Sequence, residues 1–160
     1  MKYILFCLTL FVSLHMAQSQ NYTKEEMASI QDFLEKFQGA AEVKDSALLE
    51  QLIAPSSVTG EDLRAITIQE VLKNDESNTG DFSFSLKAFD LIVDSLYAKF
   101  TPISPDLLNM LKKQSEFALL NELTPSQIPL FDYKDAHIIL IWQDKDIKLL
   151  FWEGMNKLLH

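Results

Sequence analysis

The sequence predicts an α+β fold in which several amphipathic helices pack on a C-terminal antiparallel β-hairpin or small sheet. Two observations carry this prediction. Apolar residues recur at helical spacing through most of residues 23–122, and two apolar runs, 137–142 and 147–152, flank a short polar stretch near the C-terminus. With 48% hydrophobic and 23% charged residues, the composition excludes a disordered chain.

Three helices are expected in the N-terminal half. The first begins at a capping box, Thr23–Glu26, in which a hydroxyl and a carboxylate accept hydrogen bonds from free amides, and it is expected to end at Gly39. A second helix is expected within residues 45–54, and a third is expected to start near residues 59–62. The apolar side chains expected on their buried faces are Met27, Ile30, Phe33, Leu34, Phe37, Leu48, Leu49, Leu52, Ile53, Leu63, Ile66, Val71 and Leu72.

The middle of the chain begins with a polar loop at residues 73–81. Residues 82–100 are ambiguous, because their first aromatic residues alternate as in a strand, whereas a longer set of apolar residues recurs as in a helix. The longer pattern favours a helix. Ser104 followed by Pro105 is typical of another helix start, and Thr124 with its following proline predicts one further short turn.

The C-terminal hairpin is expected to pair residue 142 with residue 147 across a four-residue connection. One face of it then carries only apolar side chains: Ile138, Leu140, Trp142, Ile147, Leu149 and Phe151. The other face is also mostly apolar: His137, Ile139, Ile141, Lys148, Leu150 and Trp152. Because two strands alone are marginally stable, we expect helices or more strands to cover both faces; the alternative is that the second face binds a ligand.

An alternative fold comes from a resemblance. The opening helix pair, residues 24–55, and the closing hairpin together resemble the cone-shaped fold of the nuclear transport factor two superfamily. This resemblance implies helices lying on a curved sheet. The helical pattern in the middle of the chain favours the first architecture.

The N-terminus has the features of an export signal. Lys2 precedes an apolar run of about 13 residues, 4–16, and Ala17 begins a segment with small residues at the positions that signal peptidase inspects. We predict a signal peptide at residues 1–19 and a single globular domain at residues 20–160, exported to a periplasm or secreted. The apolar run is shorter than the roughly 20 residues of a spanning helix, so we expect no integral membrane segment after cleavage.

Composition and motifs exclude several kinds of chemistry. Cys7 is the only cysteine and lies in the leader, so we expect no disulfide, thiol catalysis or thiolate-bound zinc. Loss of Lys2 changes the formal net charge from −9 to −10, which opposes nucleic-acid binding. Residues 75–86 resemble a calcium loop, but Leu86 stands where a bidentate glutamate belongs, so a solvated loop is expected. We predict no catalytic residues, no metal and no cofactor.

The absence of a catalytic motif beside an aromatic hairpin leads us to expect a non-catalytic binding protein. Its partner is expected to be a protein or a small apolar ligand. The candidate binding residues are Phe131, Tyr133, His137, Ile139 and Trp152. Two alternatives stay open: a small hydrolase with His137 as general base beside Asp135, and an acidic inhibitor or immunity-type protein whose charge accelerates encounter with a basic partner.

Overall fold

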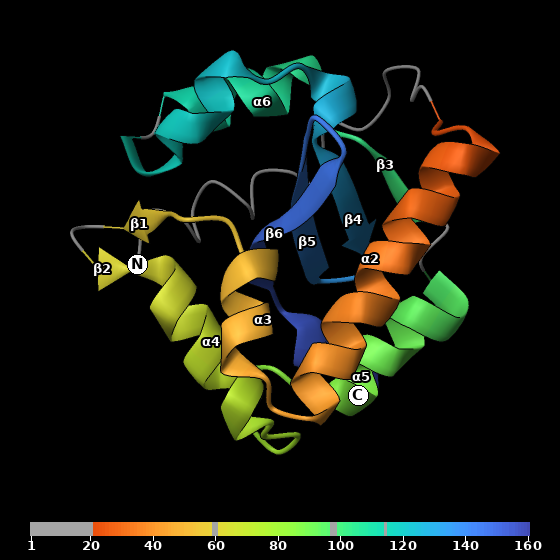
Figure 1. Ribbon diagram of the computed structural model, residues 1–160, viewed down its shortest axis with the longest axis vertical. Helices are drawn as coiled ribbons and strands as arrows, with labels where there is room; N and C mark the ends of the chain where they lie inside the picture. Colours follow the sequence, from red (N-terminus) through yellow and green to blue (C-terminus); the bar gives the residue numbers. More distant parts are fainter. Residues whose placement is uncertain (1–20, 59–60, 97–98, 114) are drawn as a thin grey trace.

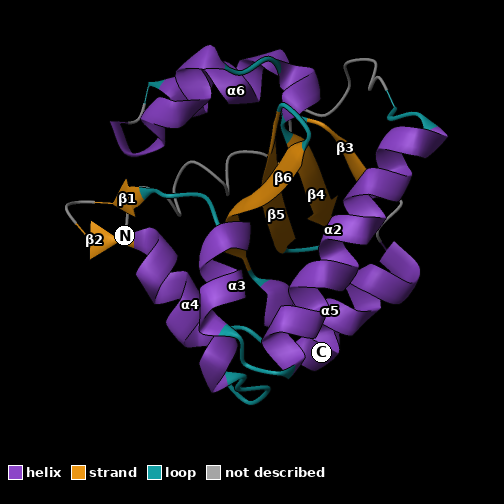
Figure 2. Ribbon diagram, in the orientation of Figure 1, coloured by secondary structure: helices purple, strands orange, loops and turns teal. Residues whose placement is uncertain are grey.

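The computed structural model describes residues 21–58, 61–96, 99–113 and 115–160, and it has the predicted α+β architecture (Figure 1, Figure 2). The predicted signal peptide, residues 1–19, lies outside the described residues. The helices are α2 (Lys24–Glu42), α3 (Ser46–Leu52), α4 (Leu63–Lys73), α5 (Leu86–Leu91), the π-helix η2 (Ile92–Leu96), α6 (Pro105–Lys112), and the 3₁₀ segments η4 (Ser115–Glu122), η5 (Pro125–Gln127) and η6 (Met155–Leu159). None of the helices described here is long and apolar enough to cross a membrane.

The strands form two antiparallel sheets. The strands are β1 (Ser57–Val58), β2 (Glu61–Asp62), β3 (Phe100–Pro102), β4 (Pro129–Tyr133), β5 (Ala136–Gln143) and β6 (Asp146–Glu153). Among the described residues, the main sheet has four strands in the order β3-β4-β5-β6, and β1 pairs with β2 in a separate two-stranded sheet. The predicted hairpin is therefore extended by two strands that the sequence did not show, because β3 and β4 are short and have proline at an end.

The predicted capping box opens α2. The Thr23 hydroxyl accepts a hydrogen bond from the Glu26 amide at 3.2 Å, and the Glu26 carboxylate accepts one from the Thr23 amide at 2.7 Å. The predicted stop at Gly39 is wrong, since α2 continues to Glu42. Ala40 and Ala41 prolong the buried face beyond the glycine, and this packing outweighs the weak helix propensity of one glycine.

Aspartate side chains cap α3 and α4. Asp45 accepts from the Leu48 amide, which confirms the predicted start of α3. Asp62 accepts from the amides of Arg64 and Ala65, so α4 begins after Asp62, at the end of the range where its start was expected; residues 59 and 60 of that range lie outside the described residues. In both helices the carboxylate bonds to amides that have no partner within the helix.

The helix predicted within residues 82–100 is confirmed over its central part. Ser85 caps α5 by accepting from the Ala88 amide at 3.3 Å, so the helix starts four residues later than the alternation begins. Phe84 precedes the helix and is fully buried, with its ring 5.4 Å from that of Trp152 and 5.8 Å from that of Phe89. The far end also differs, because β3 begins at residue 100.

The next helix confirms its predicted start and is short. Ser104 caps α6 by accepting from the Leu107 amide, and Pro105 is its first residue. The apolar pattern continues to Leu120, but α6 ends at Lys112, and residues 115–122 form the 3₁₀ helix η4. The short turn predicted at Thr124 is η5.

The hairpin register agrees with the prediction near the turn and departs from it farther along. Trp142 pairs with Ile147 as predicted, but residues 143 and 146 also pair, which leaves a two-residue turn in place of the four-residue connection. The register then shifts at a β-bulge, because Leu140 pairs with Leu149 whereas its neighbour Ile139 pairs with Phe151, which leaves Leu150 as the extra residue of β6. His137 therefore lies opposite Glu153, where unbroken pairing places Trp152.

Both faces of the main sheet are covered, which confirms the arrangement expected from the hairpin sequence. One face packs on α2, α3 and α5, and its strand residues in this core include Phe131, Ile138, Leu140, Leu149 and Trp152. The other face packs on α6 and its neighbouring segments, and its strand residues include Leu130, Ile139, Ile141, Leu150 and Phe151. Each fully buried side chain of this size stabilises the fold by about 1.5–3 kcal/mol.

The two tryptophans are predicted to differ in tryptophan fluorescence. Trp152 is buried and its indole N–H donates to the Phe82 carbonyl at 3.1 Å, whereas Trp142 is half-buried. The Trp142→Phe variant, which reports Trp152, should therefore emit at shorter wavelength and resist acrylamide quenching more than Trp152→Phe. Equal quenching of the two variants contradicts the placement of Trp152 in the core.

Replacing Gly154 or Gly39 by alanine should change the stability of the protein in opposite directions. Gly154 has φ +65°, and a Cβ there meets the Asp135 carbonyl oxygen, so Gly154→Ala should destabilise the protein by at least about 1–2 kcal/mol. Gly39 lies within α2 with open space around a Cβ, so Gly39→Ala should stabilise the protein by about 0.5–1 kcal/mol. Urea unfolding of the two variants measures both effects, and a shift of the same sign for both is the contradicting result.

Candidate functional site

The five binding residues expected from the sequence do not form one exposed surface. Phe131, Ile139, Trp152 and His137 are all buried, and only Tyr133 is half-buried. Phe131 and Trp152 lie in the core on the α2 side of the sheet, whereas Ile139 lies in the core on the α6 side. Strand pairing separates these residues between the two faces of the sheet. Phe131 on β4 and Trp152 on β6 both lie opposite Ile138, so they share its face, and Ile139 points to the other face.

His137 is the centre of a polar row across three strands. Its Nδ1 lies 3.2 Å from a carboxylate oxygen of Asp132 on β4, and Glu153 on β6 lies opposite it in register. The acid beside His137 is thus Asp132, and Asp135, expected from the sequence, lies in the turn before β5. Within the described part of the chain, no hydroxyl hydrogen-bonds to His137, so the row lacks the nucleophile that a general base activates.

Glu153 is the most unusual group in this row. It is 5% exposed, and its Oε2 has no hydrogen-bond partner among the described residues. Burial raises the pKa of Glu153, and the nearby Asp81 carboxylate raises it further, whereas His137 and Lys157 oppose these effects. The carboxyl group therefore tends to hold its proton at higher pH than an exposed glutamate.

The loop after α4 is fixed by hydrogen bonds within the chain. Asp75 accepts from the amide and the hydroxyl of Ser77, and Asn156 donates to the carbonyls of Asp75 and Asn78 at 3.0 and 2.8 Å. Gly154 donates to the Asp81 carbonyl. Among the described residues, no group of three or more His, Cys, Asp or Glu side chains is arranged to hold a metal ion.

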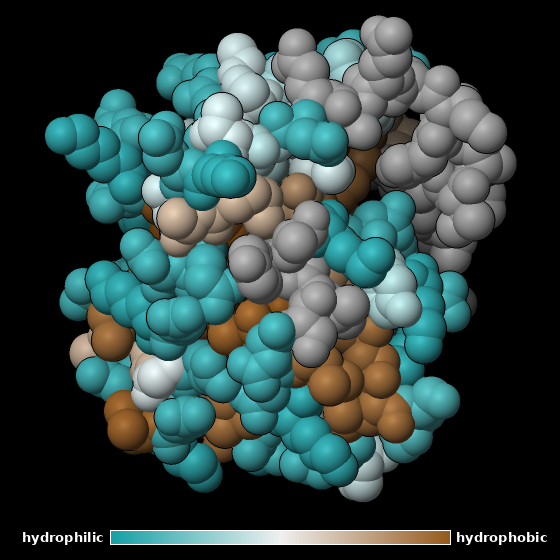
Figure 3. Space-filling model, turned by 90° about the vertical axis from the view of Figure 1, so that its right-hand side faces the viewer, coloured by the Kyte–Doolittle hydropathy of each residue, from teal (hydrophilic) through white to brown (hydrophobic). Residues whose placement is uncertain are grey.

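Exposed apolar side chains do not mark a site. Figure 3 shows hydrophilic side chains over much of one face, with hydrophobic ones gathered in its lower half. In the described part of the chain, the large hydrophobic side chains that are exposed are Val43, which follows α2, Ile66 on α4 and Leu91 on α5. Single exposed apolar residues of this kind are ordinary in folded proteins.

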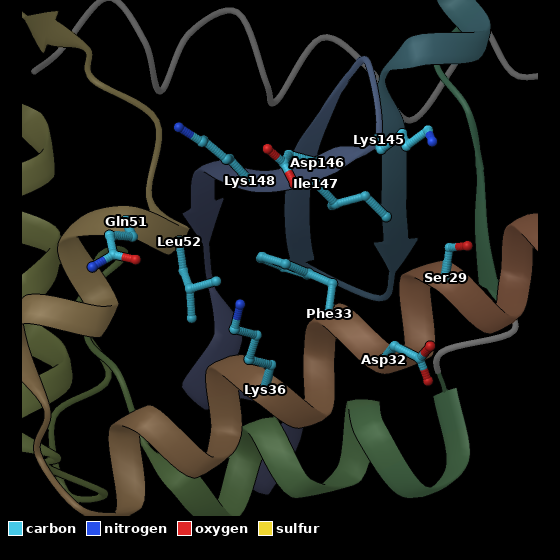
Figure 4. Close-up of a pocket in the computed structure, with 10 residues that line it drawn as sticks. All are labelled: Ser29, Asp32, Phe33, Lys36, Gln51, Leu52, Lys145, Asp146, Ile147 and Lys148. Carbon is cyan, nitrogen blue, oxygen red and sulfur yellow. The ribbon is translucent and has the colours of Figure 1, made fainter.

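A groove lies where α2, α3 and the turn between β5 and β6 meet (Figure 4). Its volume is about 540 Å³, which falls within the range of small-molecule sites, roughly 300–1,000 Å³. The lining residues are Ser29, Asp32, Phe33, Lys36, Gln51, Leu52, Lys145, Asp146, Ile147 and Lys148. We call this feature the lysine groove.

The lysine groove combines a buried apolar floor with charged walls. Phe33, Leu52 and Ile147 are buried, and Lys36 extends from α2 toward Leu52 in Figure 4. None of the three lysines of the groove has an ion-pair partner among the described residues. With three lysines and two aspartates, the groove is locally positive in a chain of net charge −9.

Sequence reasoning missed the lysine groove because its residues come from three distant segments, 29–36, 51–52 and 145–148. One local pattern does point to it. Ser29, Asp32 and Lys36 recur at helical spacing beside Phe33, so polar groups line one edge of the buried face of α2. No comparable pattern exists in the turn between β5 and β6, which reads as an ordinary polar hairpin turn.

The raised pKa of Glu153 predicts a pH-dependent stability. The protonated Glu153 side chain contributes to the stability of the fold below the pKa of an unfolded glutamate, about 4.3. This contribution is lost as pH rises through the higher pKa of the folded state, because the folded protein must then bury a charge. Glu153→Gln should therefore gain stability relative to the native protein as pH rises from about 4 to 7. Urea unfolding across this range tests the sign, with exposed Glu122→Gln as the control; a difference that does not change with pH contradicts the prediction.

The groove and the polar row thus differ in chemistry. The groove offers ammonium, carboxylate, amide and hydroxyl groups around an apolar floor, whereas the row offers a buried imidazole between two carboxylates. Comparison of the chain with protein-family models, curated proteins and solved structures gives no match.

Proposed function

We propose that the protein is a non-catalytic binding protein and that the lysine groove takes an anionic ligand with an apolar part. The observation that carries this proposal is that three lysines line a groove with a buried floor in an acidic chain, and that none of them has an ion-pair partner in the part of the chain that the structure describes. The export signal expected at residues 1–19 supports action outside the cytoplasm.

The magnitudes favour a ligand that is both charged and apolar. Exposed ion pairs contribute about 0.2–1 kcal/mol each, so three of them cannot alone give useful affinity. Contact with Phe33, Leu52 and Ile147 adds about 25 cal/mol for each Å² of apolar area removed from water. The lysines then fix the orientation and the charge of the ligand. Because Phe33, Leu52 and Ile147 are at most 8% exposed, the floor adds a contribution to the affinity without dominating it.

Two other functions have weaker support. The hydrolase alternative has the His137–Asp132 pair, but no nucleophile bonded to it in the described residues. The inhibitor alternative rests on the net charge of −9, and a basic partner is repelled by the lysine groove, so it needs a different surface. We therefore prefer the anion-binding groove.

A fluorescent anion tests the proposed function. Anilinonaphthalene sulfonate carries one negative charge on an aromatic body, and we expect the purified protein to bind it with increased emission. Reversing one groove charge, in Lys36→Glu or Lys148→Glu, should weaken this binding about five-fold, which corresponds to about 1 kcal/mol.

The matched control is Lys24→Glu, because Lys24 is exposed on the same helix as Lys36 but does not line the groove. It should leave the affinity for the dye unchanged. Equal weakening in all three variants indicates a non-specific charge effect, and unchanged binding in the two groove variants places the dye elsewhere. Either result contradicts the proposal.

A further inference from the structure

We propose that the ligand of the lysine groove is an extended acidic peptide segment that adds as a strand to the free edge of β6 at Ile147. This inference rests on the proposed function and names the class of ligand. It combines three features at one edge of the sheet: backbone groups directed outward, an apolar floor on the α2 side, and lysines that line the groove beside this edge.

The direction of the backbone groups follows from one hydrogen bond. β6 is an end strand of the main sheet, and the Leu149 carbonyl accepts from the Ala54 amide at 2.7 Å, so it points away from β5. In an antiparallel strand the N–H and C=O of one residue point to the same side, and alternate residues repeat that direction. Between Leu149 and Ile147 the pairing with β5 has no register shift, because Leu149 pairs with Leu140 and Ile147 pairs with Trp142. The N–H and C=O of Ile147, two residues from Leu149, therefore also point away from β5, to the free edge.

The covered part of this edge ends where the groove begins. Residues 53 and 54 pair with Leu149 through a single parallel bridge and a hydrogen bond, and they continue the edge no farther toward the turn. Ile147 lies two residues nearer the turn and lines the groove. An added strand here is thus limited to the short stretch beside residues 145–148.

The surroundings of Ile147 select the chemistry of the added strand. Lys145 lies in the turn before β6, Lys148 follows Ile147 on β6, and Lys36 extends from α2 toward Leu52 (Figure 4). On an extended peptide, the carboxylates of one face lie on the side of Lys148, which pairs with Ile141, and the alternate apolar side chains face Phe33 and Leu52. Lys36 lies beside the apolar row and adds positive charge there. A compact amphipathic anion uses the lysines and the floor but leaves the N–H and C=O of Ile147 without a partner.

Lysines at a sheet edge also serve a different purpose, since they prevent pairing with other strands. The two roles differ in what they predict. If the lysines serve only to protect the edge, we expect strands of any charge to bind poorly, because an added strand removes the lysines from water without giving them a partner. A binding edge accepts a strand whose charges are opposite to its own.

Peptide binding measured by fluorescence anisotropy tests the inference. The probe is a labelled seven-residue peptide of alternating glutamate and valine, and the comparison peptides are a lysine-valine version and a glutamate-valine version with methylated backbone nitrogens. We expect the acidic peptide to bind, the basic peptide not to bind, and methylation to weaken binding about ten-fold through lost main-chain hydrogen bonds. Lys36→Glu and Lys148→Glu should weaken binding about five-fold, and Lys24→Glu should not.

Hydrogen exchange supplies a second readout, because the Ile147 amide should exchange more slowly when the acidic peptide is bound. Equal affinity of the methylated and unmethylated peptides, or no protection of Ile147, overturns strand addition. If the sulfonate dye still binds in a lysine-dependent way, the proposed function survives that result. Failure of both the dye and the acidic peptide to bind overturns the inference and the proposed function together.

Discussion

The structure depends on the need to remove both faces of one apolar hairpin from water. β5 and β6 carry apolar side chains on both sides, and two strands alone cannot bury either side. The helices α2, α3 and α5 cover one face, and α6 with its neighbouring segments covers the other. The rest of the chain is arranged around this requirement, and the short strands β3 and β4 widen the sheet that the helices pack on.

The bulge in β6 decides which polar groups meet at the end of the sheet. It directs Leu150 and Phe151 to the same core and moves Glu153 opposite His137. A buried carboxyl beside an imidazole costs stability, because desolvation disfavours the charged form. The adjoining residues Gly154 and Asn156 hold the loop after α4, so the end of β6 organises a region far away in the sequence.

Local signals in the sequence predict most helix starts and little of the sheet beyond the hairpin. Thr23, Asp45 and Ser104 act on amides within three residues, so their effects are readable without knowledge of the fold. The strands β3 and β4 depend on partners that are distant in the chain, and the bulge depends on packing against two cores at once. The lysine groove belongs to this second class, since its three segments are brought together only by the folded chain.

Because one hairpin contributes to both cores, the two layers of the protein are thermodynamically linked. A residue of β6 cannot leave its place without disturbing the cover on both faces, so the described chain is expected to unfold as one cooperative unit. Any molecule that occupies the groove against Ile147 therefore stabilises α6 by mass action, although α6 does not line the groove. At a ligand concentration one hundred times its Kd, this stabilisation amounts to about 2.7 kcal/mol for the whole fold.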